Sequence, residues 1–471
     1  MGRLFFLLLF VAISVVALAR PWIGVVSAYM VSVLTPQAVW YWDFDGIRPV
    51  LWVMVPTCIG IAIGLARNDF NLAVMRQWRN LCILILWICF TLSYYFGPYT
   101  QVGGPWRFDD PAAAMAILNK ILLLYFMACL CIDTELKLKA LFYVVAGSAV
   151  YLIYWANSEY LQGHVVERLA GPVDLYGMGI YADENDFAML FVVAQSLLWF
   201  LGASQKRQAL RWAIWLIIPF CWHAVFLTGS RGGLLGLAAT TVLIALRSKS
   251  RLLGLALIPA FLFVYNWQAG SLMKSRADTI SNYQADASAE DRLDAWRAAG
   301  RMIAAHPITG VGLASFGPAF PDYSDKHPRE AHNTLLQITA QSGLLAGAMY
   351  VLIVLTSLRG LWRNGARLKA RDGPKEGDML FCINEATLIA LAGLVVCSFF
   401  LSLQEFEIFY CLNVLANAVL YLSGGKVAER GAIPAAAPVS AARRHIRALA
   451  TGIARRRGRP LRGARIHQGE R

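Results

Sequence analysis

Charged side chains are scarce in this sequence. Asp, Glu, Lys and Arg make up 15% of its 471 residues, whereas hydrophobic residues make up 58%. Soluble globular domains carry about 25% charged residues, so this composition excludes a water-soluble fold for most of the chain. The apolar runs also lack the polar–apolar alternation of strands. Helices, which satisfy their own backbone hydrogen bonds within lipid, are therefore expected.

The motifs of nucleotide-dependent and metal-dependent enzymes are absent as well. The sequence has no Walker loop, no dinucleotide-binding glycine fingerprint, no HExxH pair and no internal repeat. All nine cysteines fall in or at the ends of apolar runs, and the spacing of Cys129 and Cys131 does not make a metal-ligand set. We interpret the cysteines as packing residues and expect neither a cofactor nor a metal ion.

What the sequence does contain is a series of apolar segments of membrane-spanning length. A helix needs about 20 residues to cross the hydrocarbon core, so we predict an all-α polytopic membrane protein with about 12–13 transmembrane helices. The expected spans lie near residues 4–19, 22–38, 50–66, 80–96, 112–132, 139–156, 185–203, 212–228, 231–246, 252–267, 333–358, 380–403 and 406–423. The first span has a second interpretation as a signal peptide, because Ala17-Leu18-Ala19 resembles a cleavage site.

The spans divide the chain into four regions. These are N-terminal transmembrane helices (1–267), one long polar loop (268–331), C-terminal transmembrane helices (332–425) and a basic tail (426–471). The tail is expected to be disordered and to contact anionic lipid headgroups rather than nucleic acid.

The placement of the net charge of +14 predicts the topology. Basic residues cluster in alternate loops and in the tail: Arg67, Arg76 and Arg79; Lys206, Arg207 and Arg211; Arg247, Lys249 and Arg251; Arg359, Arg363, Arg367, Lys369 and Arg371; and residues 426–471. The positive-inside rule places these segments in the cytoplasm and the long loop on the opposite face of the membrane.

The most informative position is the junction of the long loop with the next apolar segment, at His332 and Asn333. Asn333 is a good helix N-cap, and the span that follows is expected to be continuous from 333 to 358. His332 would then stand at a helix N-terminus, which lowers the pKa of a histidine and keeps it neutral and able to accept a proton. The alternative is a histidine that only bonds loop carbonyls, and position alone does not separate the two.

A second candidate lies in the tight turn between two spans at residues 228–233. Ser230 can cap the helix that begins at Arg231. A cation at the positive end of a helix dipole is unfavourable unless an anion binds there. The alternative is that the Arg231 guanidinium reaches lipid headgroups.

Within the long loop, residues 290–297 have the pattern of a helix. Arg292 and Trp296 are separated by four residues, so they would share one face of that helix. Arg292 is therefore a second arginine expected on the loop side of the membrane.

Other polar residues stand at the ends of spans or inside them. The segment that starts at Arg168 leads to Asp183 and Asn185 just before an apolar helix. Capping is their simplest role, although the segment offers more capping residues than one helix needs. Lys120 lies inside an apolar run, where a charge is costly and often functional, or else it snorkels toward the surface.

The order of these features resembles that of a known family. Along the chain they are Ser230–Gly232 opening a helix, Arg292 with Trp296, Gly310–Gly312 with Phe316, and His332–Asn333. This order resembles the O-antigen ligase and polymerase superfamily of bacterial inner-membrane glycosyltransferases. The ligase signature is His, then Asn, Ser or Gln, nine residues, Gly, two residues, and Gly, Thr or Tyr. The chain matches this signature through Gly343 and departs from it at Ala346, with Gly347 one residue late.

The first half of the chain carries a second resemblance. Residues 18–24, Pro36, the aromatic cluster 40–44 and residues 182–187 look like the ligase-like proteins associated with exosortase systems. Together, the two resemblances touch most of residues 1–425.

The resemblance implies a function. Such proteins transfer a glycan from an undecaprenyl diphosphate carrier to an acceptor hydroxyl on a lipid A core, a protein or another glycan. The expected location is the bacterial inner membrane with the active site facing the periplasm, without a metal ion. By match to the family, His332 is expected to be the catalytic base, and Arg231 and Arg292 are expected to bind the diphosphate. The expected supporting residues are Ser230, Asn333, Lys120, Arg168, Asp183 and Asn185.

Two alternatives stay open at this point. A polymerase of lipid-linked repeat units differs from a ligase only in its acceptor. The second alternative is a transporter or flippase for a lipid-linked glycan. Such proteins place polar groups near the bilayer midplane and often show repeated halves. The polar residues here gather in the long loop and at its rim, which favours the enzyme.

Overall fold

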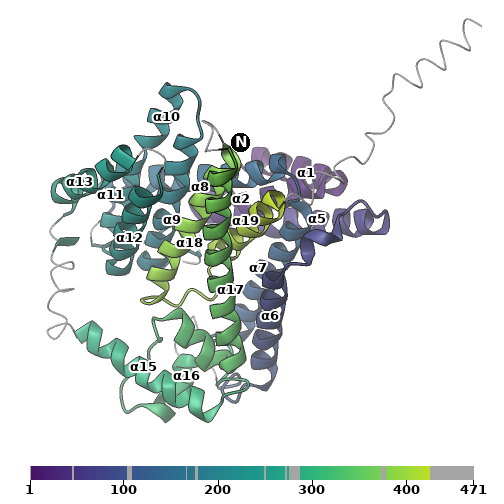
Figure 1. Cartoon of the computed structure of the whole chain (residues 1–471). Coiled ribbons are helices and arrows are strands. Elements are labelled where there is room, and N and C mark those ends of the chain that lie inside the picture. The colour runs from purple at the N-terminus through teal and green to yellow at the C-terminus, as the bar shows by residue number, and fades with distance from the viewer. Residues whose placement is uncertain are drawn as a thin grey trace, which may run out of the picture. The chain divides into compact units, whose positions relative to one another are not determined.

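A computed structural model of the chain describes residues 2–44, 47–102, 109–165, 167–174, 179–248, 251–270, 273–274, 287–372 and 378–424. These residues form helices joined by loops, and none of them lies in a strand (Figure 1). The helices are α1 (Gly2–Ala19), α2 (Pro21–Leu34), α3 (Pro36–Val39), α4 (Tyr41–Phe44), α5 (Pro49–Ala66), η1 (Leu72–Met75), α6 (Trp78–Phe96), α7 (Pro111–Cys131), α8 (Glu135–Leu161), α9 (Glu184–Ala203), α10 (Gln208–Trp215), α11 (Ile218–Thr228), α12 (Arg231–Arg247), α13 (Arg251–Gln268), α15 (Ala287–Ala305), α16 (Phe316–Tyr323), α17 (Thr334–Asp372), α18 (Met379–Ser398) and α19 (Glu407–Ser423).

The predicted all-α polytopic membrane fold is confirmed. A helix coincides with each predicted span, and the span near 212–228 is divided between α10 and α11. Among the described residues, ten helical segments are long and apolar enough to cross a membrane, and two shorter apolar helices lie at 252–268 and 407–423. The predicted basic tail at 426–471 lies outside the described residues.

The centre of the bundle is formed by α9 and α18, which pack against each other. Their most apolar stretches are 83% and 78% buried, against 11% for α1. A helix that is apolar on every side is expected where other helices surround it. The exposed apolar side chains of α1 are instead suited to contact lipid tails, which are as apolar as leucine.

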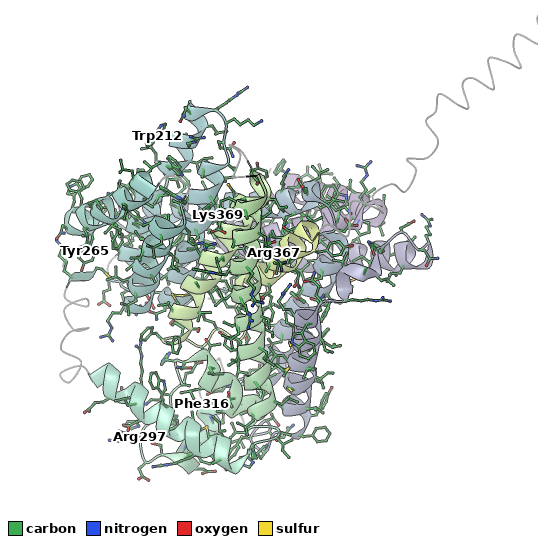
Figure 2. The ribbon with its side chains drawn as sticks, in the orientation of Figure 1. Trp212, Tyr265, Arg297, Phe316, Arg367 and Lys369 are labelled. Atoms are coloured by element: carbon green, nitrogen blue, oxygen red, sulfur yellow. The ribbon has the colours of Figure 1, made fainter. Side chains whose placement is uncertain are left out.

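The two ends of the bundle differ in what they carry. At one end, α15 and α16 pack against the start of α17 (Figure 1). Their shared core consists of Ala295, Ala298, Ala299, Met302, Val311, Phe316, Ala319, Phe320, Ala331 and Ala340. We call this the loop end, and Figure 2 shows Phe316 and Arg297 within it. The last residues of α9 and α12 reach the opposite end of the bundle. We call it the basic end, because it carries Lys206, Arg207 and Arg247.

The long helix α17 is interrupted at Gly343, whose backbone angles (φ 87°, ψ 170°) are not helical. A Cβ added at Gly347 would lie 3.1 Å from the Cβ of Thr339. In a continuous helix, positions eight residues apart are separated by about 12 Å along the axis. The chain therefore turns back at Gly343, and residues 334–342 pack alongside the helix that starts at residue 344. This finding corrects the predicted continuous helix over 333–358.

The loop at residues 307–312 fills this turn. Two of its N–H groups donate to the carbonyls of Ala340 (2.9 Å) and Gln341 (3.1 Å), and one of its carbonyls accepts from the Leu344 N–H (2.9 Å). These bonds satisfy the backbone groups that two helix ends would otherwise leave open. A Cβ at Gly343 would overlap a carbonyl of the same loop, so only glycine fits there.

Candidate functional site

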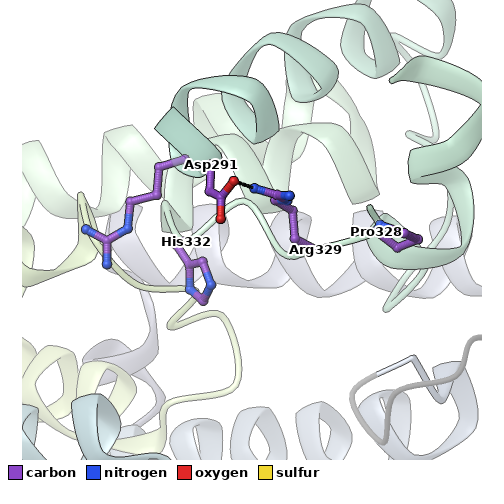
Figure 3. Close-up of a pocket in the computed structure, with 5 residues that line it drawn as sticks. Asp291, Pro328, Arg329 and His332 are labelled. Atoms are coloured by element: carbon purple, nitrogen blue, oxygen red, sulfur yellow. Dashed lines mark ion pairs between the residues drawn. The ribbon is translucent and has the colours of Figure 1, made fainter. Parts of the chain in front are cut away.

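A cavity of about 300 Å³ opens at the loop end, lined by Asp291, Arg292, Pro328, Arg329 and His332 (Figure 3). Asp291 and Arg292 come from α15, and the other three come from the segment just before α17. The helix predicted over 290–297 thus exists within α15 and brings Arg292 to the same cavity as His332.

His332 is held in an unusual backbone conformation. Its φ is 46°, in the left-handed region that residues other than glycine seldom adopt, although asparagine, aspartate and histidine do so more often than the rest. The preceding residue, Ala331, is fixed on both sides: its N–H donates to the Gln337 side chain (3.0 Å) and its carbonyl accepts from the Trp296 indole (2.9 Å). Asn333 caps the N-terminus of α17, because its side-chain oxygen accepts a hydrogen bond from the Leu336 N–H (3.1 Å). Strained backbone held in this way is typical of functional sites.

The electrostatic surroundings keep His332 neutral. Burial lowers its pKa below the ordinary value of 6.5, and the positive charges of Arg292 and Arg329 lower it further, whereas Asp183 opposes them. A neutral imidazole can accept a proton at pH 7. The predicted direction of the pKa shift is therefore confirmed, although burial rather than the helix terminus is its main cause.

Phe400, in the loop after α18, lies close to Arg292 and to Gly232, the residue that follows Arg231. The Arg292 guanidinium lies 5.9 Å from the centre of the Phe400 ring. A Cβ at Gly232, next to Arg231, would lie 3.3 Å from the Cβ of Phe400. The loop after α18 therefore joins the start of α12 to α15, across about 60 residues of intervening sequence.

A third arginine, Arg329, was not predicted from the sequence. Its guanidinium forms an ion pair with Asp291, and its side chain is 20% exposed. The only sequence signal was its position three residues before His332, in a segment whose polar composition resembles an ordinary loop. The structure makes it a lining residue of the cavity.

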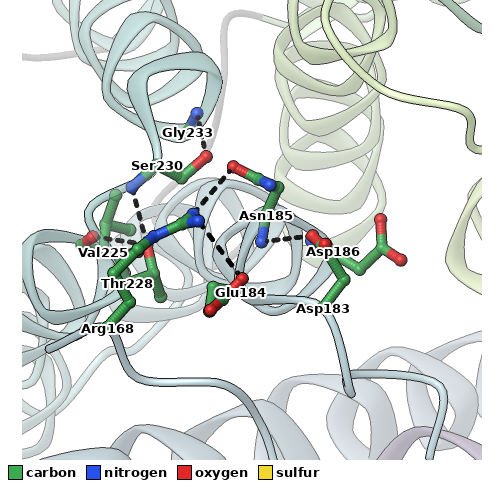
Figure 4. Close-up of polar contacts among 9 residues, drawn as sticks. All are labelled: Arg168, Asp183, Glu184, Asn185, Asp186, Val225, Thr228, Ser230 and Gly233. Atoms are coloured by element: carbon green, nitrogen blue, oxygen red, sulfur yellow. Dashed lines mark hydrogen bonds and ion pairs between the residues drawn. The ribbon is translucent and has the colours of Figure 1, made fainter. Parts of the chain in front are cut away.

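A second set of polar contacts fixes the turn that carries Arg231 (Figure 4). The Arg168 guanidinium donates to the carbonyl of Thr228 (2.9 Å) and to the Asn185 side chain (3.2 Å), and it pairs with Glu184 (3.3 Å). These contacts tie the turn before α12 to the start of α9. Arg168 and Asn185 thus hold the scaffold of the site rather than line the cavity.

The predicted capping roles of Asp183 and Ser230 are present in the structure, whereas Asn185 lies inside α9 and its side chain accepts a hydrogen bond from Arg168. Asp183 accepts the first free N–H groups of α9 (2.7 and 3.3 Å), and Ser230 accepts an N–H of α12 (3.1 Å). The negative charge of Asp183 also raises the pKa of His332, against the effect of burial and of the two arginines.

Glu330, next to Arg329 in the segment before α17, interacts electrostatically with several carboxylates. Burial raises the pKa of Glu330 to about 7, and the negative charges of Glu405, Asp109 and Asp183 add to the effect. A raised pKa favours the protonated, uncharged form of Glu330. This reduces the negative charge that would oppose an anion bound by the arginines.

Lys120 does not line the cavity. It is an exposed side chain on α7, and it interacts electrostatically with Glu407 and Arg48. Its supporting role at the site stays a prediction.

Comparison with known proteins gives one family match. Residues 216–351 match the family model described as O-antigen ligase. No curated protein matches the chain. The matched region contains Arg231, Arg292, His332 and the glycine at the turn of α17, and it supports the predicted O-antigen ligase and polymerase superfamily.

Proposed function

We propose that the protein transfers a glycan from a polyprenyl diphosphate carrier to an acceptor hydroxyl. The match of residues 216–351 to the O-antigen ligase family model supports this proposal. The loop end would face the periplasm of a bacterial inner membrane, as the positive-inside rule predicts. The observation that carries the proposal is one cavity in which a neutral, strained histidine stands beside two arginines.

His332 is proposed as the general base. Its unprotonated nitrogen accepts the proton of the acceptor hydroxyl as the hydroxyl oxygen attacks the anomeric carbon. The bond from that carbon to the diphosphate oxygen breaks, and the diphosphate leaves on its carrier. Attack opposite the leaving group inverts the configuration of the sugar. A positioned base of this kind contributes about 10²–10⁴-fold to a rate.

The arginines are proposed to hold the diphosphate and to stabilise the charge that it gains. Guanidinium groups offer paired donors that match phosphate oxygens. Arg292 and Arg329 line the cavity, and Arg231 begins the adjacent helix α12. Because Arg329 pairs with Asp291, an arriving diphosphate would compete with that carboxylate for the same cation.

The glycans that accumulate in a bacterial host carrying a mutant of this protein would identify the acceptor. Arg231→Ala should reduce transfer about 10-fold or more, because hydrogen bonds to charged groups contribute about 1.5–3 kcal/mol. Loss of a polymerase leaves single repeat units on the lipid acceptor, whereas loss of a ligase leaves polymer on the carrier. Mass spectrometry of the host glycans separates these results. Arg207→Ala, at the basic end, is the charge-matched control, and normal glycans in the Arg231 variant would contradict the proposal.

The resemblance to exosortase-associated ligase-like proteins remains a prediction. It makes a protein hydroxyl one candidate acceptor, and the same glycan analysis would reveal it as carrier-linked glycan that fails to reach protein.

The pH dependence of transfer offers a second test. Arg292 lowers the pKa of His332, so Arg292→Gln should raise it. The protonated, inactive form of the base would then persist to higher pH. The acid limb of kcat/KM should therefore move upward in pH, in addition to a loss of about 10- to 100-fold in kcat/KM from the missing charged hydrogen bond.

Two variants serve as controls for this shift. Arg292→Lys keeps the positive charge, so the limb should stay near its wild-type position. Arg297→Gln removes an arginine from the same helix that is 69% exposed and pairs with Asp294 instead, and it should not move the limb. An unchanged limb in Arg292→Gln would show that His332 is not the titrating base.

A further inference from the structure

A second cavity, of about 410 Å³, lies nearer the basic end and has no part in the proposed reaction. Its walls come from α12, α17 and α18. They consist of Leu243, Arg247, Leu358, Arg359, Trp362, Arg363, Leu388, Ile389 and Ala392. Arg231 and Arg247 begin and end α12, so the two sites are separated by about 24 Å along that helix.

One of the three arginines in this cavity is fully engaged by the protein. The Arg247 guanidinium donates twice to the buried carboxylate of Glu385 (2.6 and 2.9 Å). It also lies 4.3 Å from the ring of Trp362, a cation–π contact. Its charge is therefore balanced within the fold.

The other two arginines have no such balance. Arg359 and Arg363 are exposed and stand one helical turn apart on α17. In the described part of the chain, neither guanidinium has an ion pair or hydrogen bond. Two like charges at this spacing destabilise a helix. An anion between the guanidinium groups would remove that repulsion.

The rest of the cavity is apolar. Leucine, isoleucine and alanine side chains of three helices form its inner wall, and Trp362, which is 54% exposed, stands at its edge. Tryptophan favours the boundary between headgroups and acyl chains. The cavity thus combines a place for a phosphate with an apolar wall suited to a fatty acyl chain.

We propose that this cavity binds an anionic glycerophospholipid of the leaflet at the basic end. Arg359 and Arg363 hold its phosphate, and its acyl chain lies against the apolar wall between α17 and α18. Basic pockets between transmembrane helices are known binding places for anionic lipid headgroups. The proposal does not depend on the reaction at the loop end.

Lipid retention by the full-length protein tests this site. The protein is purified from vesicles of phosphatidylglycerol and phosphatidylcholine with identical acyl chains, and native mass spectrometry counts the lipids that remain bound. The wild type should retain one phosphatidylglycerol in preference to phosphatidylcholine. The double variant Arg359→Gln, Arg363→Gln should bind it about 30-fold more weakly, because each arginine near a membrane surface contributes about 1 kcal/mol.

Two further variants separate a built site from general surface charge. Lys206→Gln with Arg207→Gln removes the same charge from exposed residues of the basic end outside the cavity, and it should leave retention unchanged. Ala392→Phe fills the apolar wall without altering charge and should displace the lipid. Equal retention of both lipids by the wild type, equal loss in the Lys206 and Arg207 control, or displacement by inorganic phosphate alone would each overturn the proposal.

Discussion

Replacing His332 with alanine should reduce glycan transfer by about 10²–10⁴-fold, the contribution expected of a general base. The carrier-linked donor should still bind, because the arginines that are proposed to hold its diphosphate remain. The measurement is the turnover number of the purified protein in lipid nanodiscs with a polyprenyl diphosphate glycan as donor, together with donor affinity. A loss of donor binding with normal turnover at saturation would assign His332 to binding instead of catalysis.

The backbone at His332 requires a second variant. Because φ is 46° there, alanine could lose activity by releasing strain and moving the loop, whereas asparagine tolerates this conformation. His332→Asn should be as inactive as His332→Ala if the imidazole is the base. His327→Ala, an exposed histidine of the same loop, should retain wild-type turnover.

Replacing Gly343 with alanine should produce a large loss of stability for the addition of one methyl group. The residue has φ 87°, and its Cβ would overlap the carbonyl of Ile308. A side chain in a strained backbone costs about 1–3 kcal/mol, and overpacking costs a further 1–3 kcal/mol or so. We expect a marked fall in Tm and loss of transfer, because the same turn holds the helix that begins just after His332.

Gly300→Ala is the matched control for this substitution. Gly300 lies in α15, is exposed, and a Cβ there would meet nothing within 4 Å. Alanine is more favourable than glycine inside a helix by about 0.5–1 kcal/mol, so this variant should be as stable as the wild type or slightly more so. A Gly343→Ala protein with unchanged Tm would mean that the turn in α17 does not exist.

The membrane architecture was predictable from the sequence because the bilayer imposes a local rule. A segment of about 20 apolar residues must form a helix that satisfies its own backbone. Capping is local in the same sense, so Asp183, Ser230 and Asn333 were assigned correctly from their positions before apolar runs. The order of His332 and Gly343 in the chain was likewise enough to suggest the family.

The turn in α17 was not predictable in this way. Residues 333–358 have the composition of one uninterrupted span, and nothing local to Gly343 demands a break. The break depends on the loop at 307–312, whose backbone groups replace the helix's own hydrogen bonds. The nine residues between Asn333 and Gly343 therefore form a short helix, after which the chain reverses direction. Only the three-dimensional structure shows this reversal.

The sequence by itself determined that the chain crosses a membrane many times, where most of its helices begin, and that His332, Arg231 and Arg292 were the residues to consider. Only the tertiary structure brought Arg292 to the cavity of His332, added Arg329 to its lining, and placed Phe400 near both Arg292 and Gly232 at the start of α12. Lys120 is not among the residues that line this cavity. The physical reason is that burial and capping depend on near neighbours in the chain, whereas a site of converging charges depends on contacts between helices that are distant in sequence.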